Sequence, residues 1–340
     1  MKVLLCSVIF VLGALASAGE ESSEGVKLEY KYRPGLELHY TLTGTMTELK
    51  SPQHTFAGKA RILVCQLDSA TGVALLASFY ELVDNTKGAE SATEHRLSVS
   101  RVQSNGKAIL HELKGDLEIV GDLLKPLQKP VFFELQLPPT RTQVGQTWNG
   151  GLHVVVGGYE LPASHTLAEI KSVDGKQHAV IKAAAEEREQ REKTATAEAE
   201  YLFDVDGGVV AQQQFKYESL VRSKLKIQVE IKLDKCQRVA AEAVALESAC
   251  AKRLYAILPT LFDGDIDTAL AECRKERAAL KDKVWQEGLD YIVERIEIVN
   301  HLRGRLEEVS KEAQARIEAE VRKQAERERK QQAAEPGKGK

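Results

Sequence analysis

The sequence predicts an α+β protein in which a large antiparallel β-meander is followed by a C-terminal helical hairpin and a long charged helix. Three observations predict this class. Apolar and polar residues alternate with a period of two across residues 26–233, hairpin-type turns separate the extended runs, and the period changes to 3.6 after Leu233. A meander of this length has to curl into a half-barrel, a barrel or a sandwich to bury its apolar face.

The N-terminus has the three parts of a secretory signal peptide. Lys2 supplies a positive charge, an apolar run from Val3 to Leu15 follows, and Ala16-Ser17-Ala18 provides a small-residue cleavage pattern. We therefore expect cleavage before Gly19, with residues 19–25 as a polar linker. The apolar run is shorter than the roughly 20 residues of a transmembrane helix. The mature chain is expected to be secreted or periplasmic.

The strand pattern is clearest at residues 224–233, where five aliphatic residues alternate with a charged row. Residues 36–43 alternate in the same way. Such alternation is typical of an antiparallel sheet with one wet face, because buried parallel strands are apolar throughout. Further strands are expected at 60–67, 73–82, 95–102, 131–137, 152–156, 165–172, 178–184, 196–203 and 209–219.

Turn residues separate these runs. Asn105-Gly106, Asp174-Gly175 and Asp206-Gly207-Gly208 tolerate the positive φ that tight hairpins require. One short helix is expected to interrupt the sheet at residues 116–127, where five aliphatic residues share a stripe and Pro126 lies near the end. Its simplest role is to cover the mouth or the concave face of the sheet.

Short motifs carry a resemblance to a known group. Tyr30-Lys31-Tyr32-Arg33-Pro34-Gly35, and Leu137-Pro138-Pro139 followed by Val144-Gly145-Gln146-Thr147-Trp148, resemble strand entries of uncharacterised secreted bacterial β-domain proteins. The resemblance covers about half of the chain. It implies a β domain and no particular chemistry, because the group has no agreed activity. In its order of elements the chain is also similar to the N-terminal part of large lipid-transfer proteins, without a shared residue motif.

Residues 234–332 are expected to form a helical or coiled-coil arm, with 333–340 as a disordered tail. A first helix ends near Leu258-Pro259, and Asp265 is a natural N-cap for the second. The long third helix has an apolar seam at three- and four-residue steps. This seam consists of Leu289, Ile292, Ile296, Val299, Leu302, Leu306 and Val309.

Four cysteines follow the signal peptide: Cys65, Cys236, Cys250 and Cys273. If residues 234–258 form one helix, Cys236 and Cys250 lie roughly 21 Å apart along its axis and cannot bond. Cys250 and Cys273 each lie about twelve residues from a turn centred near Leu261-Phe262. An antiparallel helix pair therefore predicts a Cys250–Cys273 disulfide, with four buried free thiols as the alternative.

No catalytic, metal-binding or phosphate-binding signature occurs in the sequence. None of the eight histidines has an H-x-x-x-H or H-E-x-x-H spacing. Asp263, Asp265 and Asp267 lack the glycine and the glutamate that complete a calcium loop. The formal net charge of −3 gives no case for nucleic acid. We therefore expect no enzyme, no cofactor and no metal site.

The first functional hypothesis is an exported binding module that holds an apolar ligand, such as a lipid, or docks a partner on the concave face of its sheet. Candidate lining residues are Tyr40, Phe79, Phe132 and Phe133, although core packing is the commoner role of aromatic residues. The alternative is a structural envelope protein that self-associates, or binds another protein, through the seam of its C-terminal helix. An enzyme without a recognisable motif is the third hypothesis.

Overall fold

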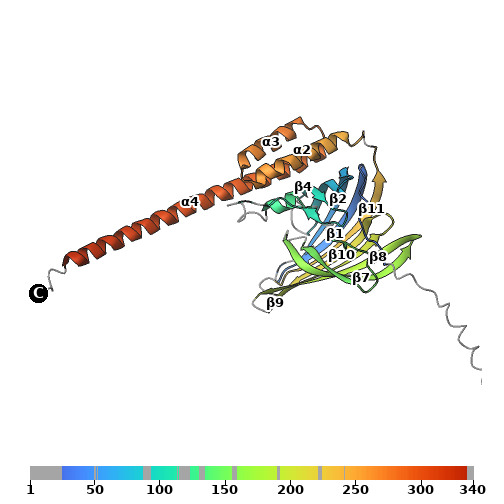
Figure 1. Ribbon diagram of the computed structural model, residues 1–340, viewed down its shortest axis with the longest axis horizontal. Coiled ribbons are helices and arrows are strands. Elements are labelled where there is room, and N and C mark those ends of the chain that lie inside the picture. Colours follow the sequence, from blue (N-terminus) through green and yellow to red (C-terminus); the bar gives the residue numbers. More distant parts are fainter. Residues whose placement is uncertain are drawn as a thin grey trace, which may run out of the picture.

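The computed structural model describes residues 25–49, 51, 53–86, 93–112, 114, 123–129, 135–154, 159–189, 192–220, 224–240 and 242–334. Within these ranges one sheet is followed by three helices (Figure 1). The strands are β1 (Leu36–Thr47), β2 (His54–Asp68), β3 (Val73–Asp84), β4 (Thr93–Val102), β5 (Ala108–Ile109), β6 (Thr147–Val154), β7 (Tyr159–Val173), β8 (Lys176–Glu189), β9 (Glu192–Asp204), β10 (Val209–Ser219) and β11 (Lys226–Arg238). The helices are η1 (Lys125–Leu127), α2 (Ala245–Phe262), α3 (Ile266–Ala279) and α4 (Lys283–Ala334).

All strand pairs are antiparallel, and their order is β5-β4-β3-β2-β1-β11-β10-β9-β8-β7-β6. Apart from β5 and β6, strands that follow one another in the chain are neighbours, and at the centre β1 pairs with β11 from Leu36↔Arg238 to Thr47↔Lys226. The first and last strands thus join two meanders into one sheet. The outermost strands, β5 and β6, do not pair with each other, so the described sheet is curled and open. This confirms the predicted α+β meander followed by helices.

Two differences from the predicted elements concern segment ends. Strand β11 continues to Arg238, because residues 235–238 keep pairing with β1 beyond a bulge at His39/Tyr40. The helical arm therefore starts at Ala245 and not at residue 234, and Cys236 lies on a strand. At the other end, α4 includes residues 333 and 334, while 335–340 and the predicted signal peptide, 1–18, lie outside the described residues. The strand predicted at 131–137 is not formed at 135–137, and 131–134 are likewise outside.

A first apolar core lies on the inner face of the curl and receives side chains from both meanders. The alternation in the sequence accounts for it: along β9, alternate residues from Ala195 to Phe203 are buried. Tyr201, Phe203 and Phe215 are among its largest fully buried side chains. This core therefore holds the two halves of the sheet against each other.

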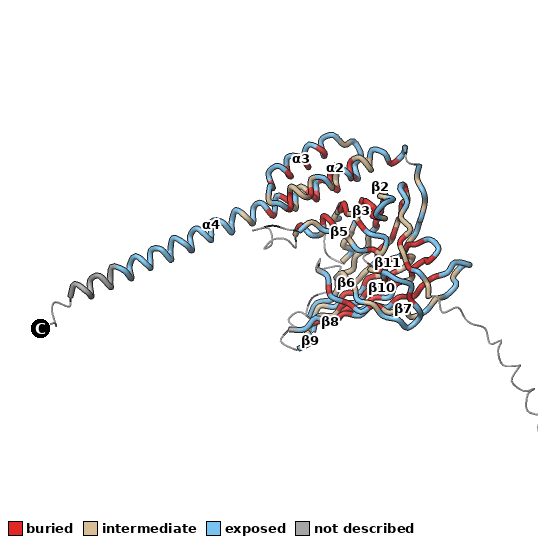
Figure 2. The backbone as a smooth tube through the Cα atoms, viewed as in Figure 1, coloured by how far each residue is buried: buried red, intermediate tan, exposed pale blue. Residues whose placement is uncertain are grey.

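A second core lies on the opposite face of β2, β3 and β4, which α2 and α4 cover, while α3 packs on these two helices (Figures 1 and 2). Strand β3 is buried on both faces from Val73 to Tyr80, in agreement with its unbroken apolar run. Leu97 and Val99 of β4 meet Leu289 and Ile296 of α4 in this second core. The helices thus cover only the first meander from outside.

The segments that contain the two motifs of the resemblance lie side by side at one end of the curl. Val26 and Thr142 form an isolated antiparallel bridge, and the Tyr30 hydroxyl donates to the Leu135 carbonyl at 3.2 Å. The Tyr30 amide donates to the carbonyl of Ser104 in the β4–β5 turn. These extended segments, distant in sequence, therefore pack together and close that end of the inner face.

The helix predicted at 116–127 is described only over its last turn. Leu124 and Leu127 are buried there, in the second core between β4 and the C-terminal helices. We had expected this helix to cover the mouth or the concave face, but its described turn does not. Leu124 and Leu127 pack against the C-terminal helices instead, and the sequence pattern alone does not distinguish helices from a sheet as the covering partner.

Candidate functional site

The inner face changes character along the strands. Its large aromatic side chains come mainly from β1, β3, β9 and β10. On β7, β8 and β9 small side chains lie opposite one another, as in the row Ala163↔Ala185↔Ala197 and the pair Ala199↔Ala183. Gly44 of β1 and Gly58 of β2 lie on the same face, opposite the larger side chains of Phe56 and Leu42. Small side chains let the two halves of the sheet approach closely. They also leave backbone atoms to form much of the inner surface.

Five buried polar side chains on this inner face have an oxygen or nitrogen without a hydrogen-bond partner in the described structure. All are at most 4% exposed. They are Ser78, Ser98, Ser100, His165 and Gln213. Ser78 and Ser98 are direct cross-strand partners on β3 and β4. An unsatisfied buried polar group costs about 1–3 kcal/mol, so five such groups on one face call for a physical explanation.

His165 is the clearest member of this group. Its ring lies at 0% exposure on β7 and stacks on Trp148 of β6, with 5.7 Å between ring centroids. Both ring nitrogens lack a partner, and burial lowers the pKa of His165 to about 4. The imidazole is therefore neutral at pH 7, with one nitrogen able to donate and the other able to accept. A Cβ added at Gly150 would lie 2.9 Å from the His165 ring, so glycine is needed above it.

The predicted lining residues are distributed unequally. Tyr40 lies on the inner face, where its hydroxyl donates to the Val210 carbonyl at 3.1 Å. Phe79 does not: it points to the helices and packs edge-on against Trp285 of α4, at 4.8 Å between centroids. The pairing register places Tyr40, Ala60 and Tyr80 in one cross-strand row on the inner face. Phe79 is next to Tyr80 along β3, so it points to the opposite face. Phe132 and Phe133 lie outside the described residues.

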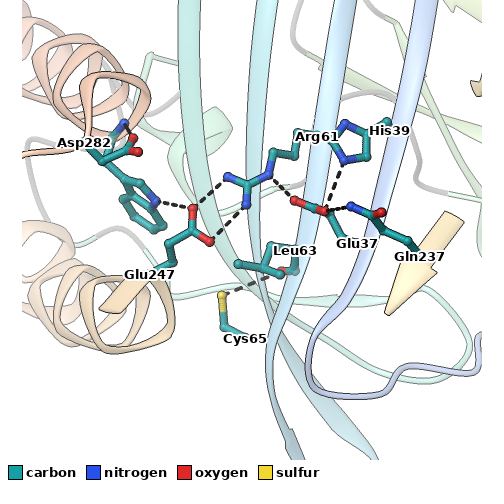
Figure 3. Close-up of polar contacts among 9 residues, drawn as sticks. Glu37, His39, Arg61, Leu63, Cys65, Gln237, Glu247 and Asp282 are labelled. Atoms are coloured by element: carbon teal, nitrogen blue, oxygen red, sulfur yellow. Dashed lines mark hydrogen bonds and ion pairs between the residues drawn. The ribbon is translucent and has the colours of Figure 1, made fainter. Parts of the chain in front are cut away.

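A polar cluster joins the helices to the sheet on the outer side (Figure 3). Arg61 of β2 donates two hydrogen bonds to the Glu247 carboxylate of α2, at 2.7 and 2.9 Å, and a third to Glu37 of β1 at 2.5 Å. The indole Nε1 of Trp285 donates to the same Glu247 at 2.9 Å. One guanidinium thus connects two strands with two helices, and we call Glu37, Arg61, Glu247 and Trp285 the clamp.

The clamp is charged and largely removed from water. Glu37 is 5% exposed. Burial alone would raise the pKa of Glu37, but hydrogen bonds from Gln237, Arg61 and His39 hold it at about 2. The carboxylates in turn raise the pKa of Arg61 despite its partial burial. Sequence reasoning missed the clamp, because its members are far apart in the chain and follow no motif.

The predicted Cys250–Cys273 disulfide is wrong. The four described cysteines are free thiols; Cys65, Cys250 and Cys273 are buried, and Cys236 is exposed. The helical turn lies at 263–265, so Cys250 is twelve residues before the end of α2 and Cys273 seven residues after the start of α3. This offset of about five residues separates the two by roughly 7 Å along the hairpin.

The predicted helix seam divides into two parts. Leu289, Ile292, Ile296 and Val299 are at most 4% exposed and pack into the second core. Leu302, Leu306 and Val309 are 37%, 41% and 58% exposed, on the part of α4 that projects from the body (Figure 2). The first part of the arm is therefore intramolecular, while the second has no covering partner among the described residues.

Within the part of the chain that the structure describes, no cluster of three or more His, Cys, Asp or Glu side chains could hold a metal ion. No described helix is both long and apolar enough to cross a membrane. The inner face and the clamp are two places in the described chain where buried polar groups gather.

Comparisons with known proteins give structural matches. No protein-family model and no curated protein match the chain. A lipovitellin structure that concerns lipid–protein interactions aligns with 73% of this chain at 10% identity and a TM-score of 0.38, and this chain spans 33% of that one. A Bacteroides fragilis protein with a YmcC-like fold, predicted to be exported, aligns over 62% of this chain and 99% of its own, at 10% identity and a TM-score of 0.31. A LolA superfamily protein from Nitrosomonas europaea aligns over 63% and 91%, at 7% identity and a TM-score of 0.18.

A bacterial protein described as exported is thus among the structures that this chain is similar to, in line with the resemblance of the short motifs. All three TM-scores are below 0.5, too low to indicate a function for this chain.

Proposed function

We propose that this protein is an exported, non-catalytic binding module that holds an amphiphilic ligand, an apolar chain with a small polar group, between the two halves of its curled sheet. The observation that carries the proposal is the set of five buried polar side chains, each with at least one oxygen or nitrogen that lacks a hydrogen-bond partner, on an otherwise apolar inner face. A bound molecule that offers hydrogen bonds there would remove a penalty of about 1–3 kcal/mol for each group it reaches.

The chemistry of the inner face defines the ligand class. Its rows of alanines and aromatic rings favour a hydrocarbon chain, since burial of apolar surface contributes about 25 cal/mol per Å². His165 is neutral at pH 7, because burial lowers its pKa to about 4, so it suits a hydroxyl, carbonyl or protonated carboxyl group. A fatty acyl lipid or a free fatty acid has both parts.

The open edge of the sheet provides the route. Strands β4 and β6 lie at or beside the two free edges and share no strand pairing. Charged side chains gather between them: Arg96 of β4 and Lys129 act on the half-buried His153 of β6, whose pKa is lowered to about 4, chiefly by desolvation. Charged side chains that separate at these edges become hydrated, so their separation costs little free energy. Separating the central strands would instead break their backbone hydrogen bonds. Entry therefore requires these edges to part.

Binding can be tested with oleic acid as the probe. Native mass spectrometry of gently purified chain should show a bound apolar mass, and added oleic acid should change the emission of Trp148, which stacks on His165. A Trp285→Phe background removes the second of the two tryptophans. Absence of both an extractable lipid and an oleate-dependent change would refute the proposal.

A matched pair of variants tests the location. Ala197 is 1% exposed on the inner face of β9, and the next residue, Glu198, is exposed on the outer face. Ala197→Phe should weaken oleate binding at least tenfold, because its ring occupies space beside the alanine rows. Glu198→Phe adds the same ring outside and should bind like the parent. Equal binding by the two variants would place the ligand elsewhere.

A further inference from the structure

The projecting part of α4 has an apolar stripe that nothing in the described chain covers. From Leu302 onward the helix extends away from the body (Figure 1). At about 100° per residue, five residues fall within a sector of about 80°. They are Leu302, Leu306, Val309, Ala313 and Ile317, and Ile317 is 62% exposed.

This stripe is not a continuation of the face that packs on the sheet. The residues from Leu289 to Val299 that enter the second core point in a direction about 80° away around the helix. The stripe therefore faces past the body, into solvent. An isolated charged helix gains nothing from an ordered apolar stripe, whereas a helix pair buries it.

Charges beside the stripe favour a second copy in antiparallel orientation. A two-fold axis near Val309 sets Leu302 against Ile317 of the other copy, and Leu306 against Ala313. On one flank the same axis sets Arg305 against Glu312 of the other copy, twice by symmetry.

One further opposite-charge pair follows from the same axis, because Glu294, exposed near the body, meets Lys323. A parallel pair would instead oppose residues five positions apart, so that Arg305 faces Ser310 and Glu312 faces Ile317. The antiparallel arrangement therefore pairs the charges of Arg305 and Glu312, whereas the parallel arrangement leaves both without an opposite charge.

Ion pairs within the helix compete with this arrangement. Arg305 lies 3.1 Å from Glu308, and Arg316 lies 4.0 Å from Glu312. All four side chains are at least 65% exposed, and such surface pairs are worth about 0–1 kcal/mol. They can therefore be exchanged for pairs between helices when the stripe is buried.

We propose that two copies of this protein associate through the projecting part of α4, paired antiparallel about Val309. Sedimentation of the intact chain over a range of concentrations should show a monomer–dimer equilibrium. Val309→Glu places two carboxylates at the axis and should weaken the dimer at least tenfold. Lys311→Glu, on the opposite side of the same helix, should leave it unchanged. A monomer at every concentration, or equal effects of both variants, would overturn the proposal.

A charge exchange tests the orientation. Arg305→Glu and Glu312→Arg should each weaken the dimer, because each opposes like charges across the axis. The double variant should restore it, since the opposed charges are again opposite. If only the pairs within each helix mattered, the double variant would combine both losses. A double variant weaker than either single one would therefore exclude the antiparallel arrangement.

Discussion

Replacing Arg61 with leucine removes the centre of the clamp and leaves Glu37 and Glu247 without their cation. The side chains of Glu37 and Glu247 are 7% and 18% exposed. Removing one partner of a buried ion pair costs about 3–5 kcal/mol, because the remaining charge is desolvated and unpaired. Arg61 itself keeps 26% of its side chain exposed, which places the expected loss near the lower end, about 3 kcal/mol.

A matched control exists in the same helical layer. Arg277 of α3 also makes a two-pronged contact with a carboxylate, that of Asp290 in α4, at 2.6 and 3.0 Å. Its side chain and that of Asp290 are 45% and 52% exposed, so Arg277→Leu should cost less than about 1 kcal/mol. The two variants share chemistry and geometry and differ in burial.

The assay is urea unfolding, monitored by circular dichroism and by the fluorescence of Trp285, whose indole is hydrogen-bonded to Glu247. The difference in unfolding free energy between the parent and Arg61→Leu should shrink as the pH falls from about 4.5 toward 2, because protonation neutralises the carboxylates that have lost their cation. The parent itself loses stability in that window, since the folded pKa of Glu37, about 2, lies below its unfolded value. If Arg61→Leu costs no more than Arg277→Leu, the clamp does not hold the helices on the sheet.

The remaining predictions concern burial. The folded pKa of His165 is about 4, so stability is fully present above pH 6.5 and falls on acidification toward pH 4; the parent should lose about 2 kcal/mol more than His165→Gln between pH 7 and 5 in urea titrations. In native chain beginning at Gly19, Cys236 should react with Ellman's reagent, while the three buried cysteines, whose pKa values burial raises to about 12, should react only after unfolding; four fast thiols would refute this. Ile296→Ala should cost about 3 kcal/mol and Val321→Ala less than 0.5 kcal/mol by urea midpoint, and equal losses would contradict the division of α4.

The strands and their antiparallel class could be predicted from the sequence, because alternation with a period of two reports burial of one face directly. Lys226 to Leu233 is paired as that pattern implies. Alternation does not report what covers a face. Phe79 and Tyr40 are both apolar strand positions, yet one meets the helices and the other meets the opposite half of the sheet.

Prediction of the site would have required the alignment of helices and strands relative to one another, which the sequence does not contain. An error of a few residues in the position of the α2–α3 turn was enough to place Cys250 and Cys273 at one level, when the described hairpin offsets them. His165 gave no signal because a lone histidine in an alternating strand is usually a satisfied surface residue. Its unpartnered nitrogens become visible only once its neighbours are known.

The continuity of α4 makes it a lever. From Lys283 to Leu302 the helix is embedded over roughly 28 Å, and from Leu302 to Ala334 it extends for roughly 48 Å with no described joint. A sideways load at the far end therefore acts on the embedded part with a mechanical advantage of a little under two. Trp285, at the inner end, is hydrogen-bonded to the carboxylate that grips Arg61. A force on the C-terminal end of α4 therefore acts on the clamp, where the helices are joined to the sheet.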